Sequence, residues 1–137
     1  MMVLTTSQMD ITRDQDVVLF RNRVKEYAVK IGMSLVNQTK LITAASELVR
    51  NMLKYANGGK VILEIISHNN ITGVRLVFED QGPGIENIPQ AMQDGFSTGK
   101  SLGMGLPGAK RLVNEFDIKS EVGKGTKVSI TRWKNAH

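Results

Sequence analysis

The sequence predicts an α+β protein, a two-layer α/β sandwich in which one mixed sheet is covered on one face by three helices. Two observations carry this prediction. Apolar residues recur at helical spacing along residues 17–31 and 41–55, and they alternate with other residues along 72–80. No linker, repeat or low-complexity stretch interrupts the chain, so we expect residues 1–137 to form a single domain.

Composition narrows the class of protein. Apolar residues make up 41% of the 137 residues, enough for a packed core, and the absence of cysteine excludes disulfides, thiolate metal sites and cysteine nucleophiles. No apolar run is long enough to cross a membrane and the first residues do not form a signal peptide, so we expect a cytoplasmic protein without membrane contact. The net charge of +5 is spread along the chain and only 5% of residues are aromatic, which favours an anionic ligand or acidic partner over nucleic acid.

The first half of the chain predicts one strand and two helices. Residues 3–12 alternate weakly and predict an edge strand. The apolar stripe of residues 17–31 predicts a first helix. Ser34 is suited to cap a second helix that runs to about Ala56, where Asn57-Gly58-Gly59 stops it.

The second half predicts two strand pairs around a helix. Residues 60–67 and 72–80 form strands joined by a polar turn, and period two places Asp80 on the covered face of the sheet, where a carboxylate needs a hydrogen-bonding partner. A third helix carries the apolar stripe of residues 106–116. Two strands then flank Gly123-Lys124-Gly125, and Thr126 points to the same side as Asp80.

Two glycine-rich elements bound residues 80–106. Asp80-Gln-Gly82-Pro-Gly84 follows a strand, and Gly103-Met104-Gly105-Leu106 opens a helix. The carboxylate can accept hydrogen bonds, and free N–H groups at a helix start attract phosphate. Either element alone is a weak signal, but both in this order predict a nucleotide site.

Glu47-x-x-x-Asn51 and Gly123-x-Gly125-Thr126 complete a series of four motifs. With them the sequence resembles the GHKL ATPase and kinase superfamily, which has the Bergerat ATP-binding fold, over roughly residues 40–133. It is most similar to the small serine/threonine kinases of bacterial partner-switching modules, the RsbT type that acts in the stressosome. This similarity is carried by A-S-E-L-V-R-N at 45–51, E-D-Q-G-P-G-I at 79–85 and D-G-F-S-T-G-K-S-L-G-M-G-L-P-G-A-K-R-L-V-N-E-F at 94–116.

The resemblance assigns roles to residues. It implies that Asn51 binds Mg²⁺ and that Glu47 is the catalytic general base, whereas a plain helix-face Asn and an ion pair between Glu47 and Arg50 are the structural alternatives. It implies that Asp80 accepts the exocyclic amine of adenine. The other expected nucleotide contacts, with residues 85–102 as a lid, are Asn51, Lys54, Gly82, Gly84, Ile85, Lys100, Gly103, Met104, Gly105, Leu106 and Thr126.

The resemblance also implies an activity and partners. We expect an ATP- and Mg²⁺-dependent kinase that phosphorylates Ser or Thr of STAS-domain antagonist or scaffold proteins. Once released, it would bind and activate a PP2C-type phosphatase through the regulatory domain of that phosphatase. The alternatives are an anti-sigma factor kinase that binds a sigma factor directly and an ATP-gated binding module with little turnover. Arg50 and Tyr55 depart from the usual anti-sigma pattern, which argues against direct binding of a sigma factor. Besides these partners, the chain could also pair with a second copy of itself as a homodimer.

Overall fold

The computed structural model describes residues 1–93 and 102–136. Its elements in chain order are β1 (Met2–Ile11), α1 (Asp14–Lys30), α2 (Leu35–Ala56), β2 (Gly59–His68), β3 (Ile71–Glu79), α3 (Ile88–Ala91), α4 (Leu102–Arg111), β4 (Glu115–Glu121) and β5 (Gly125–Trp133). Within the described residues, no helix combines the length and the apolar character needed to cross a membrane.

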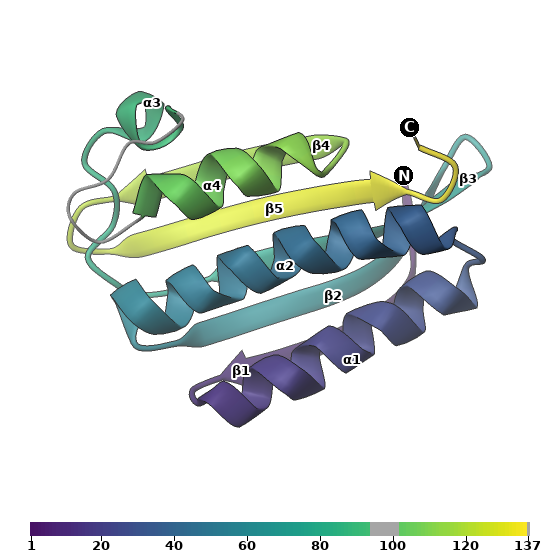
Figure 1. Ribbon diagram of the computed structural model, residues 1–137, viewed down its shortest axis with the longest axis horizontal. Coiled ribbons are helices and arrows are strands. Elements are labelled where there is room, and N and C mark those ends of the chain that lie inside the picture. The colour runs from purple at the N-terminus through teal and green to yellow at the C-terminus, as the bar shows by residue number, and fades with distance from the viewer. Residues whose placement is uncertain (94–101, 137) are drawn as a thin grey trace.

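The described elements form two layers. The sheet has five strands in the order β1-β2-β3-β5-β4, so the predicted edge strand does lie at an edge. The long helices α1, α2 and α4 lie side by side over one face of this sheet (Figure 1), as an α+β sandwich requires. The four-residue α3, which the sequence did not predict, belongs to the segment between β3 and α4.

The prediction of a mixed sheet is wrong, because all four pairs of neighbouring strands are antiparallel. The connections explain this. The pairs β2-β3 and β4-β5 are hairpins, which are antiparallel by construction. Between β1 and β2 the chain runs back along α1 and returns along α2. It therefore enters β2 at the end where β1 stopped, and β2 runs antiparallel to β1.

The core lies between the helices and the sheet. Its fully buried side chains come from both layers, and they include Phe20, Leu41, Val49, Leu63, Leu76 and Ile130. Phe20 of α1 packs edge to face on Phe78 of β3, with ring centroids 5.8 Å apart. This contact fixes α1 over the sheet.

Local signals set the ends of several elements. Ser34 Oγ accepts a hydrogen bond from the N–H of Asn37 and caps α2 as predicted. Asn57 ends the same helix in the left-handed conformation, with φ of 61°. The predicted third helix corresponds to α4, which is shorter than the apolar stripe of residues 106–116 predicted. It ends at Arg111, and Phe116 belongs to β4. Alternation in β4 and helical periodicity both place Phe116 toward the core, so the pattern could not separate them.

Candidate functional site

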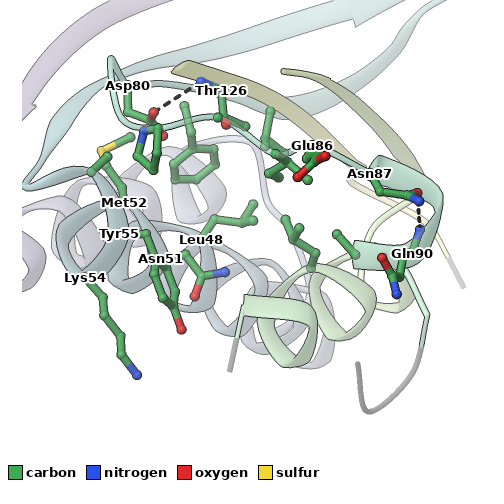
Figure 2. Close-up of a pocket in the computed structure, with 18 residues that line it drawn as sticks. Leu48, Asn51, Met52, Lys54, Tyr55, Asp80, Glu86, Asn87, Gln90 and Thr126 are labelled. Carbon is green, nitrogen blue, oxygen red and sulfur yellow. Dashed lines mark hydrogen bonds between the residues drawn. The ribbon is translucent and has the colours of Figure 1, made fainter. Parts of the chain in front are cut away.

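One cavity lies at the end of the sandwich where α2 and β3 finish and β5 begins. It has a volume of about 960 Å³, near the upper end of the roughly 300–1,000 Å³ usual for ligand pockets. Its polar lining comes from four segments of the chain (Figure 2), namely Asn51, Lys54, Tyr55, Asp80, Glu86, Asn87, Gln90 and Thr126. Its apolar lining includes Leu48, Met52, Phe78, Ile85, Leu106 and Val128. An apolar slot with a few convergent polar groups suits a flat heterocycle that carries a polar tail.

Asp80 lines this cavity and is held in place by backbone hydrogen bonds. One carboxylate oxygen, Oδ1, accepts hydrogen bonds from the N–H of Gly82 at 2.9 Å and the N–H of Thr126 at 3.1 Å. The N–H of Asp80 in turn donates to the carbonyl of Thr126 at 3.0 Å. Among the described residues Oδ2 has no partner, so the carboxylate is fixed in orientation and offers one free acceptor.

A short strap, residues 82–85, closes the wall beside Asp80. Within this strap, the carbonyl of Pro83 accepts a hydrogen bond from the N–H of Gly123. The N–H of Ile85 donates a hydrogen bond to Ser120 Oγ at 2.7 Å. Gly84 has φ of 78°, and a side chain there would collide with the carbonyl of Glu121. The strap is therefore bound to the β4–β5 hairpin, and Ile85 contributes to the cavity wall.

Gly82 and Gly125 allow other parts of the chain to approach their backbone closely. Neither is among the described residues that line the cavity. A side chain at Gly82 would collide with Ala56 at the end of α2. Gly125 has φ of 126°, and a side chain there would collide with the carbonyl of Asp80. Both glycines thus set the position of Asp80 relative to α2 and β5.

Gly105 of α4 lies against the side chain of Asn51 of α2. A Cβ atom at Gly105 would collide with the Asn51 amide. Asn51 Nδ2 is buried and has no hydrogen-bond partner among the described residues. A buried amide group without a partner costs free energy unless a ligand or water satisfies it.

Tyr55 is a cavity residue that sequence reasoning did not assign a role. It lies one turn after Asn51 on α2, and its buried hydroxyl likewise has no partner among the described residues. Lys54 Nζ lies 5.4 Å from the centroid of the Tyr55 ring, a cation–π distance. The i,i+4 spacing of Asn51 and Tyr55 was visible in the sequence, and it was the signal that could have found Tyr55.

Glu47 occupies the same helix one turn before Asn51. It is not among the described residues that line the cavity, and its Oε1 lies 3.7 Å from Arg50 Nη1. The ion pair considered as an alternative is therefore present. Both side chains are well exposed, at 42% for Glu47 and 63% for Arg50, and such a surface pair is weak enough to exchange for another contact.

Of the remaining predicted residues, three belong to α4 and Lys100 lies outside the described part of the chain. Leu106 of α4 lines the cavity. Gly103 and Met104 are in the first turn of α4, where N–H groups lack helical partners. Lys100 and much of the predicted lid lie outside the described residues. Glu86, Asn87 and Gln90, which belong to the predicted lid segment, also line the cavity, and Asn87 Oδ1 caps α3 by accepting from the N–H of Gln90.

The fold and this cavity define the class of protein. The chain belongs to the family of histidine kinase-, DNA gyrase B- and HSP90-like ATPases, which it matches over residues 36–136. Within this class it is a homologue of the serine/threonine-protein kinase RsbT of Bacillus subtilis (strain 168). The two are 41% identical over 123 residues, which cover 90% of this chain and 92% of RsbT. The predicted superfamily and RsbT-type similarity are thereby confirmed.

More distant relatives agree with this placement. An anti-sigma F factor of Thermoanaerobacter sp. (strain X514) is 30% identical over 130 residues, covering 90% of this chain and 89% of the relative. The RsbU and RsbW domains of a Mycobacterium tuberculosis protein share the fold with a TM-score of 0.65 at 19% identity, over 97% of this chain and 34% of that one. The mycobacterial sensor histidine kinase MprB shares it with a TM-score of 0.56 at 18% identity, over 97% of this chain and all of that one.

The contact between Gly105 and Asn51 gives a first prediction. Gly105→Ala should leave the melting temperature within a few degrees of the original, because the colliding atoms belong to the end of one side chain that can turn away. The displaced Asn51 amide should lower affinity for ATP with Mg²⁺ by about tenfold or more, measured by calorimetry. Gly108→Ala is the matched control, since a Cβ atom there meets nothing within 4 Å. Equal affinities of Gly105→Ala and Gly108→Ala for ATP with Mg²⁺ would contradict a role of the Asn51 amide in nucleotide binding.

Proposed function

We propose that this chain is an ATP-dependent serine/threonine protein kinase of a bacterial partner-switching module. The observation that carries the proposal is the cavity, which brings Asn51, Asp80 and Thr126 from three separate motifs around one space. The 41% identity to a serine/threonine-protein kinase supports the reaction type. One continuous cluster of buried hydrophobic side chains supports residues 1–137 as a single domain.

Asp80 selects the base. With Oδ1 held by two N–H groups, the carboxylate directs Oδ2 to a donor on the ligand. The exocyclic amine of adenine supplies such a donor, whereas guanine presents a carbonyl at the same position and leaves two acceptors facing each other. Phe78, Val128 and Ile85 provide the apolar walls against which the base packs.

Asn51, Lys54 and Tyr55 serve the phosphate end. The unpartnered Asn51 amide and Tyr55 hydroxyl fit polar ligand atoms, and the Lys54 ammonium adds positive charge. Gly103, Met104 and Gly105 offer N–H groups from the start of α4. Mg²⁺, which Asn51 would hold through its amide oxygen, would neutralise charge that develops on the phosphates. Among the described residues no group of three or more His, Cys, Asp or Glu side chains could hold a metal.

Glu47 serves the attacking hydroxyl. The substrate Ser or Thr oxygen forms a bond to the γ-phosphorus while the bond from that phosphorus to the bridging oxygen breaks and ADP leaves. Glu47 accepts the proton from the hydroxyl, so charge and atoms balance. Its position outside the cavity wall and its exposure suit a group that meets a protein substrate rather than the nucleotide.

STAS-domain antagonist or scaffold proteins are the proposed substrates, and a PP2C-type phosphatase is the proposed target of the released kinase. The support is similarity to RsbT-type kinases. The test is incubation of the purified chain with γ-labelled ATP, Mg²⁺ and a STAS-domain protein, followed by phosphoamino-acid analysis. Label on Ser or Thr of the STAS protein is expected. Label on no residue would contradict a kinase and favour an ATP-gated binding module.

An anti-sigma factor kinase is the second candidate, because anti-sigma F factors are 30% identical over 90% of the chain. Arg50 and Tyr55 were the departures that argued against it in the sequence. Both lie at the pocket end of α2. Direct binding of a purified sigma factor, measured by calorimetry with ADP and with ATP, would establish this second function.

Asp80→Asn gives a second prediction. The carboxamide keeps its oxygen on the N–H groups of Gly82 and Thr126, so its NH₂ group turns toward the cavity and meets the adenine amine donor to donor. Affinity for ATP should fall by about tenfold or more in calorimetry, and preference for ATP over GTP should shrink. Asp117→Asn on the exposed side of β4 is the control. A wild-type protein that binds ATP and GTP equally would refute the role of Asp80.

A further inference from the structure

Ser120 lies one layer behind the cavity wall. It is on β4, directly opposite Thr126 of β5 in the antiparallel register. Thr126 and Ile85 are among the described residues that line the cavity, whereas Ser120 is not. The Ser120 hydroxyl nevertheless bonds to both of these wall residues. It therefore connects two separate pieces of the wall.

The Ser120 hydroxyl has three close polar neighbours. Its Oγ accepts from the N–H of Ile85 at 2.7 Å and donates to the carbonyl of Gly125 at 3.1 Å. The third neighbour is Thr126 Oγ1 at 2.8 Å. A serine hydroxyl has one proton to donate and two lone pairs that accept, so three neighbours use its full capacity.

The position of each proton follows from the partners. A backbone N–H can only donate and a backbone carbonyl can only accept, so all three contacts are satisfied together when Ser120 accepts from Ile85 and gives its single proton to Gly125. The contact with Thr126 then requires the proton of Thr126. In this arrangement the Thr126 hydroxyl donates its proton to Ser120 Oγ. The Thr126 oxygen therefore presents only lone pairs to the cavity.

Thr126 and Asp80 thus form an acceptor-only wall. Asp80 offers Oδ2, and Thr126 is bound to the same carboxylate through its own N–H at 3.1 Å. Two neighbouring acceptors favour a ligand edge that carries hydrogen-bond donors, such as an amino group or the water molecules around it. They disfavour a carbonyl at the same place.

We propose that Ser120 is a positioning residue that makes Thr126 an acceptor and thereby sets the preference for 6-aminopurine over 6-oxopurine nucleotides. This inference rests on the proposed function, because it concerns the base of the nucleotide bound in the same cavity. Removal of the Ser120 hydroxyl frees the proton of Thr126, which can then donate to a purine carbonyl. It also releases the N–H of Ile85, so the strap loses one of its bonds to the hairpin.

The experiment compares two diphosphates that differ at position 6 of the purine, ADP and inosine 5′-diphosphate, by calorimetry on the full chain. The ratio of their dissociation constants is the readout, and it requires no phosphoryl transfer. In Ser120→Ala the preference for ADP should fall by about tenfold, the worth of one net hydrogen bond. Ser120→Thr keeps the hydroxyl and should keep the ratio.

Two further variants make the result decisive. Ser120→Cys retains the shape of the side chain with a poor donor and acceptor, so it should also lose preference even if the alanine variant folds badly. Ser129→Ala is the matched control, because Ser129 is on β5 but alternation places it on the other face of the sheet. An unchanged ratio, within about twofold, in folded Ser120→Ala and Ser120→Cys would overturn the inference. A wild-type chain that binds neither diphosphate would instead refute the proposed function itself, and with it the premise of the inference.

Discussion

Replacement of Asn51 by alanine should abolish phosphoryl transfer while leaving the protein folded. The Asn51 amide lines the cavity, and its buried Nδ2 has no partner among the described residues. Its loss therefore breaks no described hydrogen bond of Nδ2, and alanine is the better helix former by about 0.5 kcal/mol. We expect an unchanged or slightly higher melting temperature and a rate at least about 100-fold lower, as for loss of a group that stabilises charge on the reacting atoms.

Metal dependence separates a ligand role for Asn51 from a structural one. Binding of ADP should be measured by calorimetry with Mg²⁺ and with EDTA. The variant should lose most of the additional affinity that Mg²⁺ confers on the wild type, while metal-free binding changes little. Asn22→Ala, the same substitution on the exposed side of α1, serves as the control for helix effects. Near-normal kinase activity of Asn51→Ala would make Asn51 a structural helix residue.

The sequence was sufficient to predict the layers and several of the residues that line the cavity. Helical spacing and alternation identified the three long helices and the five strands, because one buried face determines those periods. Alternation placed Asp80 and Thr126 on the same side of the sheet and the family resemblance added Asn51, and the structure brings all three around one cavity. The prediction of strand direction was wrong. Direction depends on how many helices connect two strands, and the pattern within either strand does not contain this information.

Contacts between distant segments could not be predicted in the same way. Gly105 was expected to serve phosphates through its backbone, but its missing side chain first makes room for Asn51 on another helix. Ser120 is a polar residue in an alternating strand, and only the register with β5 places it against Thr126. The Gly105–Asn51 contact depends on how two helices pack, and the Ser120–Thr126 contact depends on the register of two strands. Local sequence patterns therefore do not predict them.

Glu47 is also near the limit of such prediction, because its position on α2 allows both an ion pair with Arg50 and a catalytic role. Glu47→Gln should lower the rate of phosphoryl transfer to a STAS-domain protein by about 100- to 10,000-fold, as expected for loss of a general base. Because Glu47 is outside the described cavity wall, affinities for ATP and for the STAS partner should stay within about threefold. Single-turnover transfer and calorimetry measure the two effects separately.

Arg50→Gln distinguishes the two roles of Glu47. It breaks the same 3.7 Å ion pair from the other side and leaves the carboxylate in place. If Glu47 acts only through the pair, both variants should show the same small effect, since exposed pairs contribute roughly 0–1 kcal/mol. If Glu47 is the base, Arg50→Gln should retain most of the transfer rate while Glu47→Gln loses it. Normal transfer by Glu47→Gln would assign proton removal to another group, and the first residue to test would then be Glu86, the other carboxylate besides Asp80 among the described residues that line the cavity.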